Sequence, residues 1–306
     1  MGRRTLRLAA AGSVALLLLP FAEPLWWGFG LPVHFPLQIA AGCLVLLPFA
    51  LVARERLPAI ALTVIVAVSL FQAREQLPRF AVAEAAAADL TAAVLNLDWR
   101  NPDLTAAESW LRQIEADLVV LPEYTPAAAR HLAGLAQVYP YRLEEAREGA
   151  WGIALLSRHP IVSGRVIRPG GIDAPALDAV IEAGGRELRV LGIHPRSPIS
   201  AAYTAERNTQ LGALAELVRE ARGATLVCGD FNDTPFSATY RNFAARAGVA
   251  NAAAGQGYPA TFPAGWLPVW IPIDHCVYRG DLVPVRVRAG PDVGSDHYPL
   301  VAEFRW

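Results

Sequence analysis

The chain contains no lysine, and all 27 of its basic residues are arginines. A codon bias explains this composition more simply than a phosphate site, which would require the arginines to cluster in space. The 28 acidic residues balance the basic ones and leave a formal net charge of −1. A protein that binds polyanions through a strong basic field is therefore not indicated.

Cysteine is also scarce, and the chain has only Cys43, Cys228 and Cys276. None of them stands in a C-x-x-C or similar metal-ligand spacing, so a zinc site is not indicated. Cys43 lies in an apolar run, and we interpret it as a small buried hydrophobe. Cys228 and Cys276 each lie in a strand-like run beside a candidate catalytic acid. The sequence leaves open whether these two cysteines form a disulfide.

Apolar residues, in contrast, make up 54% of the chain and are concentrated before about residue 73. They form three stretches, at residues 6–21, 33–53 and 57–71. The second stretch is long enough to cross a hydrocarbon core of about 30 Å as a helix, whereas the first and third are at the short end of the range. We therefore predict a membrane anchor of about three transmembrane helices over residues 1–75.

Arginines flank these stretches unevenly. Arg3, Arg4 and Arg7 lie at the start of the first stretch, and Arg54 and Arg56 lie between the second and the third. By the positive-inside rule, the N-terminus and the loop around Arg54 are cytoplasmic. Three crossings then place the catalytic domain on the far side of a bacterial inner membrane, facing the periplasm or the cell exterior.

Two alternatives fit parts of this N-terminal segment. The first stretch also resembles a signal peptide, although no clear small-x-small cleavage site follows it. The apolar stretches could instead be buried hairpin helices of a soluble fold, but the near-continuous run has no amphipathic face. We therefore expect that the first helix is retained and that a multi-pass anchor lies in the lipid bilayer.

Strand-like and helix-like patterns alternate after an Ala-rich linker at residues 76–89. Short apolar runs typical of buried strands alternate with helical segments throughout residues 90–306, which predicts a layered α/β domain. Strands are expected at 90–97, 118–121, 152–157, 188–194, 225–228, 270–278 and 300–305, and helices at 105–114, 126–135, 203–222 and 236–247.

Carboxylates, amides and histidines gather at the ends of these strands. Any one of them has an ordinary explanation as a turn or helix-cap residue. Bringing many acids together, however, costs free energy unless a cation compensates. Oxygen ligands without a cysteine–histidine cluster suit Mg²⁺ or Mn²⁺. The set comprises Asn96, Asp98, Glu123, His194, Asp230, Asn232, Asp274, Asp296 and His297.

Phosphoester hydrolysis gives a chemical reason for such a set. A hard cation neutralises the phosphoryl oxygens, while other groups activate the attacking water and protonate the leaving oxygen. The residues therefore predict a divalent-metal-dependent hydrolase of phosphoester bonds.

The order of these motifs resembles the endonuclease/exonuclease/phosphatase superfamily, over residues 91–306. The helices that precede the domain resemble the membrane-anchored, YafD-like branch of that superfamily. The resemblance implies a four-layer α/β sandwich, in which two packed sheets are flanked by helices. It rests on Asn-Leu-Asp at 96–98, Pro-Glu at 122–123, Trp-Gly-Ile-Ala-Leu-Leu-Ser-Arg at 151–158, Ile-His-Pro at 193–195, Gly-Asp-Phe-Asn at 229–232, Ile-Asp-His at 273–275 and Ser-Asp-His at 295–297.

The resemblance also implies a metal centre. Glu123 would be the principal ligand of the ion, with Asn96, Asp98 and Asp296 close to it. Members of the superfamily often have glutamine before this glutamate, whereas this chain has Pro122. The ligand itself is retained, so we expect the difference to matter little.

Catalytic roles follow from the same resemblance. Asp230 would orient or deprotonate the attacking water, and Asn232 would hold a phosphate oxygen. His297 would contact the phosphoryl group and be oriented by Asp274. His194 would bind phosphate or protonate the leaving group, and the sequence does not assign the acid and base roles between the two histidines.

The substrate class stays open at this level, between a lipid, a nucleic acid and a soluble phosphoester. No protein partner is expected. Two other functions remain as alternatives, a catalytically inactive membrane-tethered module that binds phosphoesters or acts as a sensor, and a small transporter or scaffold. Trp266 and Trp270, in a Pro-rich loop, fit a substrate wall and a membrane contact equally well, and Arg207 is expected to pack or lie on the surface.

Overall fold

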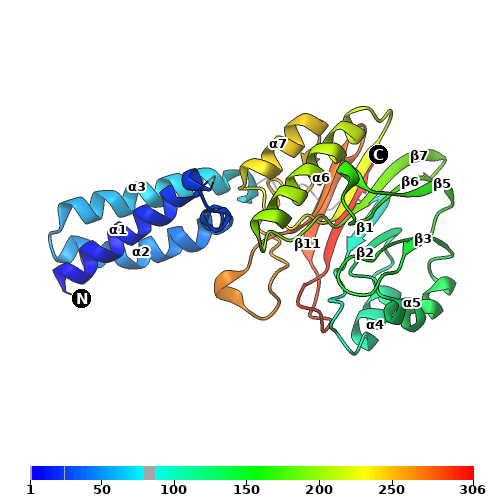
Figure 1. Ribbon diagram of the computed structural model, residues 1–306, viewed down its shortest axis with the longest axis horizontal. Coiled ribbons are helices and arrows are strands. Elements are labelled where there is room, and N and C mark those ends of the chain that lie inside the picture. The colour runs from blue at the N-terminus through cyan, green and yellow to red at the C-terminus, as the bar shows by residue number, and fades with distance from the viewer. Residues whose placement is uncertain (1, 24, 79–86) are drawn as a thin grey trace.

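The computed structural model describes residues 2–23, 25–78 and 87–306. Its N-terminal apolar stretches form helices α1 (Arg3–Leu18), α2 (Pro36–Val52) and α3 (Arg56–Ala73), which pack side by side and extend away from the rest of the chain (Figure 1). At the tip farthest from the domain, the Arg7 guanidinium donates to the Glu55 carboxylate at 2.8 Å. This ion pair joins the first helix to the turn between the other two.

The second predicted crossing differs from the prediction. Residues 33–53 do not form one helix, because the 3₁₀ helix η2 (Trp27–His34) meets α2 at an angle of 71°. Pro36 starts α2, as expected of a residue that has no backbone N–H and suits the first helical position. The spans Arg3–Ala22 and Arg56–Gln76, with 20 and 21 residues, are long and apolar enough to cross a membrane, so placing the first and third stretches at the short end was wrong.

The remainder of the described chain contains two six-stranded mixed sheets. The first has the order β11-β12-β1-β2-β4-β3, and the second has the order β5-β6-β7-β8-β10-β9. The strands are β1 (Leu90–Val94), β2 (Leu118–Pro122), β3 (Tyr141–Glu145), β4 (Ile153–Ser157), β5 (Ile161–Ile167), β6 (Ala176–Ala183), β7 (Arg186–Ile193), β8 (Thr225–Asp230), β9 (Ala250–Asn251), β10 (Asp274–Arg279), β11 (Val283–Ala289) and β12 (Leu300–Arg305).

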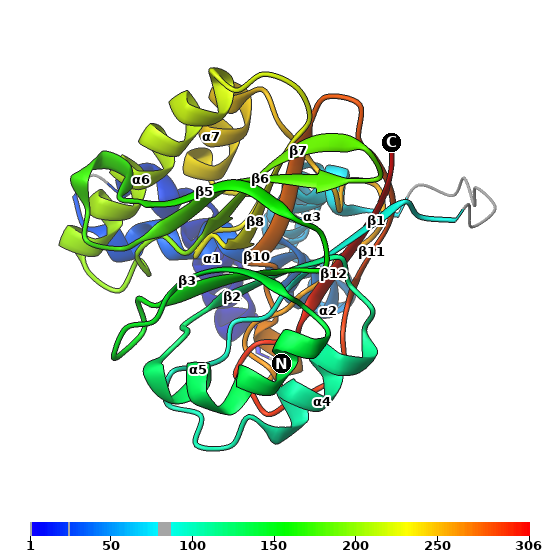
Figure 2. The same cartoon turned by 90° about the vertical axis from the view of Figure 1, so that its right-hand side faces the viewer.

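Helices cover the outer face of each sheet (Figure 2). One hydrophobic core lies between the sheets, a second lies under α4 and α5, and a third lies under α6 and α7. The predicted four-layer α/β sandwich is therefore confirmed. The helices are α4 (Thr105–Gln113), α5 (Pro126–His131), α6 (Ala201–Arg219) and α7 (Ala238–Ala247), with short 3₁₀ turns η1 (Leu19–Ala22), η3 (Arg74–Gln76), η4 (Leu132–Gln137), η5 (Pro169–Gly171) and η6 (Leu267–Val269).

The predicted strands are present with shifted ends, and several edge or near-edge strands were not predicted. The missed strands are β3, β5, β6, β9 and β11. Of these, β3, β5 and β11 have half-exposed or exposed residues along most of their length, so they lack the continuous apolar runs of buried strands. β6 is mostly buried, but Asp178 and Glu182 interrupt its apolar run, and β9 has only two residues. The strand expected at 270–278 begins only at Asp274, after Pro272. Of the linker expected at 76–89, residues 79–86 lie outside the described part of the chain.

A disulfide joins Cys228 on β8 to Cys276 on β10, which are directly opposite each other in the antiparallel ladder. The sequence left this pairing open, because it did not show that the two strands are neighbours. Cys43 is buried among the N-terminal helices, as expected.

Candidate active site

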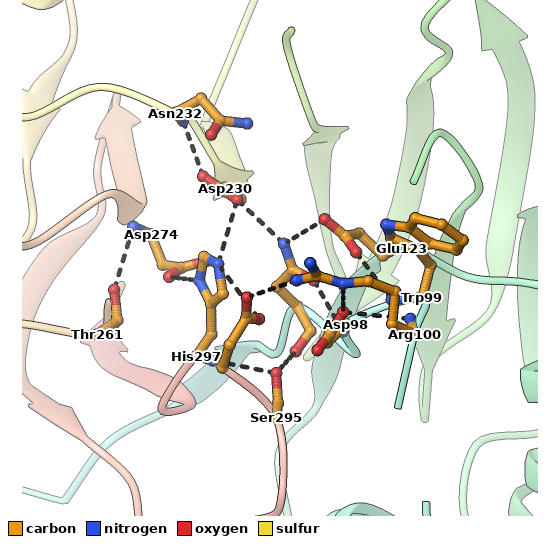
Figure 3. Close-up of polar contacts among 12 residues, drawn as sticks. Asp98, Trp99, Arg100, Glu123, Asp230, Asn232, Thr261, Asp274, Ser295 and His297 are labelled. Carbon is orange, nitrogen blue, oxygen red and sulfur yellow. Dashed lines mark hydrogen bonds and ion pairs between the residues drawn. The ribbon is translucent and has the colours of Figure 1, made fainter. Parts of the chain in front are cut away.

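The candidate residues lie where strands from the two sheets end together. β1 and β2 form a parallel pair in one sheet, and β7 and β8 form a parallel pair in the other. Asn96 and Glu123 follow the first pair, whereas His194 follows β7 and Asp230 ends β8. These strand ends converge, because Asn96 Nδ2 donates both to Glu123 Oε1 at 3.3 Å and to Asp230 Oδ2 at 3.1 Å (Figure 3).

Three site residues have left-handed backbone conformations. The φ angles are 50° at Asp98, 60° at Glu123 and 49° at Asn232. This region costs free energy for residues other than glycine, and residues held there tend to gather at functional sites. Five non-glycine residues of the described chain have positive φ, and three of them belong to the predicted site. Three residues that were predicted to act in the site therefore also have a strained backbone.

Glu123 is fixed by two hydrogen bonds. Its Oε2 accepts the backbone N–H of Trp99 at 2.8 Å, and its Oε1 accepts the amide of Asn96. The Asn96 side chain is fixed in turn, because its Oδ1 accepts the backbone N–H of Asp98 at 3.1 Å. The loop after β1 thus holds the glutamate in place without neutralising its charge.

Arg100 lies between the remaining predicted metal ligands. Its guanidinium Nε donates to Asp98 at 3.0 Å, and its Nη2 donates to Asp296 at 3.3 Å. Asp98 and Asp296 come from loops nearly two hundred residues apart in the chain, so their shared bonds to this arginine show that they converge in space. The Arg100 side chain is 62% exposed, so these two ion pairs lie at the surface of the site.

His297 forms the centre of a second group of side chains. Its Nδ1 lies 2.8 Å from Asp274 Oδ2, and its Nε2 lies 3.8 Å from Asp230 Oδ2. The two acids face each other directly across the β8–β10 ladder. Asp230, Asp274 and His297 are buried and offer ligand atoms that all lie within 4.8 Å of one another.

The charges of the site are incompletely compensated. Burial raises the pKa of Glu123 and that of Asp296. Burial and the neighbouring Asp274 carboxylate raise the pKa of Asp230. Raised carboxyl pKa values indicate that nearby positive charge does not balance the buried negative charge. A bound cation would supply that balance.

The pKa of His297 is raised, whereas burial usually lowers the pKa of a histidine. Burial acts to lower its pKa, but Asp274, together with Asp230 and Asp296, outweighs burial and raises the pKa of His297 to about 10. The imidazole is therefore a cation at neutral pH, held in a fixed orientation by its hydrogen bond to Asp274.

His194 completes the group from the β7 side. It is buried, and neither ring nitrogen has a hydrogen-bond partner among the described residues. Its Nε2 lies 3.6 Å from Asp230 Oδ2, and its ring packs on the indole of Trp151. Burial lowers the pKa of His194. The site thus contains one histidine that favours the cationic form and one that favours the neutral form, which is a suitable pair for moving a proton.

The loop after β8 holds Asn232 between these groups. The Asn232 backbone N–H donates to Asp230 Oδ1 at 2.8 Å, and its Nδ2 donates to the carbonyl of Pro195 at 3.0 Å. Arg207 on α6 is buried and donates to the Asn232 carbonyl at 3.0 Å. Arg207 therefore packs as expected, but it packs on a loop of the candidate site. His275 is buried and bonded to the Asp233 carbonyl, outside the group around His297.

The residues present fit a hard divalent cation. Glu123, Asp98, Asp296 and Asn96 offer carboxylate and amide oxygens from three neighbouring loops, which is the donor chemistry of Mg²⁺ and Mn²⁺. Among the described residues, the group whose ligand atoms all lie within 4.8 Å of one another is instead Asp230, Asp274 and His297. A zinc site built from cysteine is excluded at this position, because Cys228 and Cys276 are joined to each other. The structure thus brings all nine predicted site residues into one region at one end of the sandwich.

Sequence reasoning missed several residues of this region. Trp99 acts through its backbone N–H, so its side-chain type carries no signal. Arg100 looks like an ordinary surface arginine until Asp296 is placed beside it. Ser295 Oγ donates to the Asn96 carbonyl at 2.6 Å, and only its place in the Ser-Asp-His motif could have singled it out. Trp151 stands in a motif that was recognised, but its contact with His194 depends on the fold.

Comparison with known proteins places the chain in a family. Residues 70–297 match the model of the Endonuclease/Exonuclease/phosphatase family. Two curated UPF0294 proteins of Vibrio cholerae are each 32% identical to it over 124 residues, which is 40% of this chain. The chain spans about two fifths, 41%, of the length of these relatives.

Solved structures share the fold of the domain. A humanised Danio rerio TDP2 has a TM-score of 0.60 at 19% identity, with 71% of this chain and 99% of that chain covered. An endonuclease/exonuclease/phosphatase from Beutenbergia cavernae has a TM-score of 0.57 at 19% identity, with 72% of each chain covered. The family model covers well over half of the sequence, and the observed four layers agree with it. The chain therefore belongs to the Endonuclease/Exonuclease/phosphatase family.

Proposed function

We propose that the protein is a divalent-metal-dependent phosphoester hydrolase held in the membrane by its N-terminal helices. The observation that carries this proposal is the hydrogen-bonded connection of Glu123 and Asp230 through Asn96. This connection brings a metal-binding carboxylate of one sheet next to the proton-transfer groups of the other. A phosphoester bound across the two would contact both.

The metal would be held by Glu123, with Asn96, Asp98 and Asp296 near it, and would supply charge compensation for the phosphoryl oxygens. Mg²⁺ or Mn²⁺ is the proposed ion. The group of Asp230, Asp274 and His297 is a less suitable metal site, because the imidazole is already bonded to Asp274 and its raised pKa favours the protonated form. Metal ligation requires a neutral imidazole.

The remaining side chains would act on protons and on the phosphoryl group. Asp230 would orient the attacking water or accept its proton. His297 would donate a charged hydrogen bond to a phosphoryl oxygen, while Asp274 holds its ring in place. His194, buried and without a partner, would contact the phosphate or the leaving oxygen. Asn232 would hold a further phosphate oxygen.

Two features support an extracytoplasmic location for the domain. The N-terminus and the turn between α2 and α3 lie at one end of the helical bundle and the domain lies at the other (Figure 1). The arginines of the N-terminus and of this turn, Arg3, Arg4, Arg7, Arg54 and Arg56, are therefore on one side. The Cys228–Cys276 disulfide suits an oxidising compartment such as the periplasm. We propose an anchor over residues 1–75, a linker over 76–89 and a catalytic domain over 90–306, in a bacterial inner membrane.

Turnover of chromogenic esters by the full-length protein tests the proposed function. Bis-(p-nitrophenyl) phosphate and p-nitrophenyl phosphate would be compared for the wild type, Glu123→Gln and His297→Gln. We expect each substitution to lower kcat/KM by about 10²–10⁴-fold, the usual size of a catalytic acid–base contribution. Glu182→Gln, an exposed change on β6, is the matched control and should retain activity. Equal turnover by all four proteins would contradict the proposal and favour an inactive binding module.

A further inference from the structure

A cavity joins the candidate site to the membrane anchor. Its volume is about 570 Å³, and its lining includes Glu123, Asp230, Asp296 and His297 of the candidate site. The rest of its wall is largely apolar and is contributed from two directions. The anchor segment supplies Trp27, Leu31 and Phe35, and the domain supplies Ile199, Phe262 and Ile271.

The anchor wall of this cavity is fixed to the domain. His34 Nδ1 lies 2.8 Å from the Thr234 hydroxyl, in the loop that also carries Asp230 and Asn232. Gln38 Nε2 donates to the Trp270 carbonyl at 2.6 Å. Both contacts are made by residues at the junction of η2 and α2, where the chain bends by 71°. The bend that interrupts the second span therefore positions apolar side chains over the site.

The same end of the domain presents apolar side chains to the surroundings. Trp266 is 70% exposed and Leu267 is 69% exposed. They belong to the loop around η6, which projects from the domain on the side of the anchor (Figure 1). Exposed apolar side chains next to membrane spans are suited to the interface between lipid headgroups and acyl chains. Phe262 and Ile271, which line the cavity, lie on either side of this exposed apolar loop in the sequence.

From these three observations we infer that the substrate is a membrane lipid that carries a phosphoester. Its phosphate lies at the acidic, metal-binding end, and its apolar chain lies between the η2 segment and the wall formed by Ile199, Phe262 and Ile271. This inference rests on the proposed function and specifies its substrate class. A nucleic acid would need a basic groove that follows its backbone, whereas this cavity has apolar walls and the chain has a net charge of −1.

Equilibrium binding tests the inference independently of turnover. Methyl, butyl and hexyl phosphate would be titrated into the full-length protein in lipid nanodiscs with Mn²⁺, with empty discs as the reference. Each methylene buried from water strengthens binding by roughly threefold to fourfold, so we expect hexyl phosphate to bind at least tenfold more tightly than methyl phosphate. Affinity that does not depend on chain length would overturn the inference.

A matched pair of variants locates the chain-binding wall. Ile199 and Val162 are both exposed aliphatic residues of the domain, at 68% and 56%, but only Ile199 lines the cavity. We expect Ile199→Asp to remove the advantage of hexyl over methyl phosphate, and Val162→Asp to retain it. The same loss in both variants, or in neither, would overturn the assignment of this wall.

Two further experiments test whether the ligand enters from the membrane and whether a nucleic acid binds better. Together with the turnover assay, they distinguish failure of the proposed function from failure of the lipid inference. Adding didodecyl phosphate, a long-chain phosphodiester, to the disc should weaken hexyl phosphate binding, and absence of competition would exclude entry from the membrane. Binding of a single-stranded oligonucleotide more tightly than hexyl phosphate would also overturn the inference. If affinity rises with alkyl-chain length but no ester is hydrolysed, only the proposed function is contradicted. If esters are hydrolysed but affinity does not depend on alkyl-chain length, only the lipid inference is contradicted.

Discussion

His297 Nδ1 and Asp274 Oδ2 lie 2.8 Å apart, and this buried hydrogen bond fixes both the orientation and the charge of the imidazole. Asp274 in turn faces Asp230 across the β8–β10 ladder, where two like charges would normally repel. The cationic imidazole lies close to both acids and stabilises their proximity. The sheet therefore sets the positions of the two acids, and the loop before β12 places the imidazole between them.

Asp274→Asn tests this relationship. Loss of the carboxylate removes the attraction that raises the pKa of His297, so the pKa falls. Because the proposed role needs the protonated imidazole, the alkaline limb of the rate profile should move to lower pH. We also expect turnover at neutral pH to fall by about 10²-fold or more. A pH–rate profile checks this, with the exposed Asp281→Asn as the control, and an unmoved alkaline limb would show that His297 does not act as a cation.

Glu123→Gln should weaken metal binding. The substitution keeps the side-chain shape but removes the negative charge that a divalent ion requires. We expect the affinity for Mn²⁺, measured by isothermal titration, to fall at least about tenfold, in line with the usual cost of losing a metal-site contact. Glu182→Gln should bind Mn²⁺ as the wild type does. If the two variants bind the ion equally well, the metal lies elsewhere.

Loss of the Cys228–Cys276 disulfide should destabilise the domain. The bridge closes a loop with a sequence separation of 48 and connects the two strands that carry Asp230 and Asp274. We expect the paired Cys228→Ala and Cys276→Ala substitutions to lower the free energy of unfolding by about 2–4 kcal/mol. Thermal or denaturant unfolding measures the change. A reductant should lower the stability of the wild type and leave the double variant unaffected.

Asp178 provides a test of stability away from the site. Its buried carboxylate accepts hydrogen bonds from Arg165 and Arg189. Burial alone would raise the pKa of Asp178, but the two arginines outweigh it and hold the pKa below its ordinary value. We expect Asp178→Asn to lower the free energy of unfolding at pH 7 by about 1–3 kcal/mol.

The sign of the pH dependence follows from the lowered pKa of Asp178. The carboxylate stabilises the folded state fully above the pKa of an unfolded aspartate, about 3.9. This contribution is lost as the pH falls through the lower, folded-state pKa. The stability difference between the wild type and Asp178→Asn should therefore be constant from pH 7 to about pH 5 and shrink at lower pH. A difference that grows on acidification would contradict the assignment.

Much of the fold could be predicted from the sequence because buried strands carry a local signal. β2, β4, β7 and β8 are apolar along most or all of their length, and each was predicted to within a few residues. β5 and β11 have mostly exposed or half-exposed residues, and their pairing depends on partners distant in the chain. The bend before Pro36 was missed for a related reason, since hydropathy alone does not report a change in direction.

The candidate site was predictable as a set of residues but not as a geometry. Motif order identified the nine side chains, and the fold determined that Asn96 contacts both Glu123 and Asp230. The contribution of the N-terminal helices was not predictable, because His34 and Thr234 are 200 residues apart in the sequence. Nothing local in a hydrophobic segment indicates that it lines a cavity at the candidate site.

Removal and return of the metal tests whether turnover depends on an ion held by Glu123. The full-length protein would be treated with EDTA, assayed with bis-(p-nitrophenyl) phosphate, and assayed again after Mg²⁺ or Mn²⁺ is restored. We expect EDTA to abolish turnover and the added ion to restore it, whereas Glu123→Gln should not recover turnover at the same ion concentration. Turnover that persists in EDTA, or that Glu123→Gln supports as well as the wild type, would contradict a metal-dependent hydrolase built on this site.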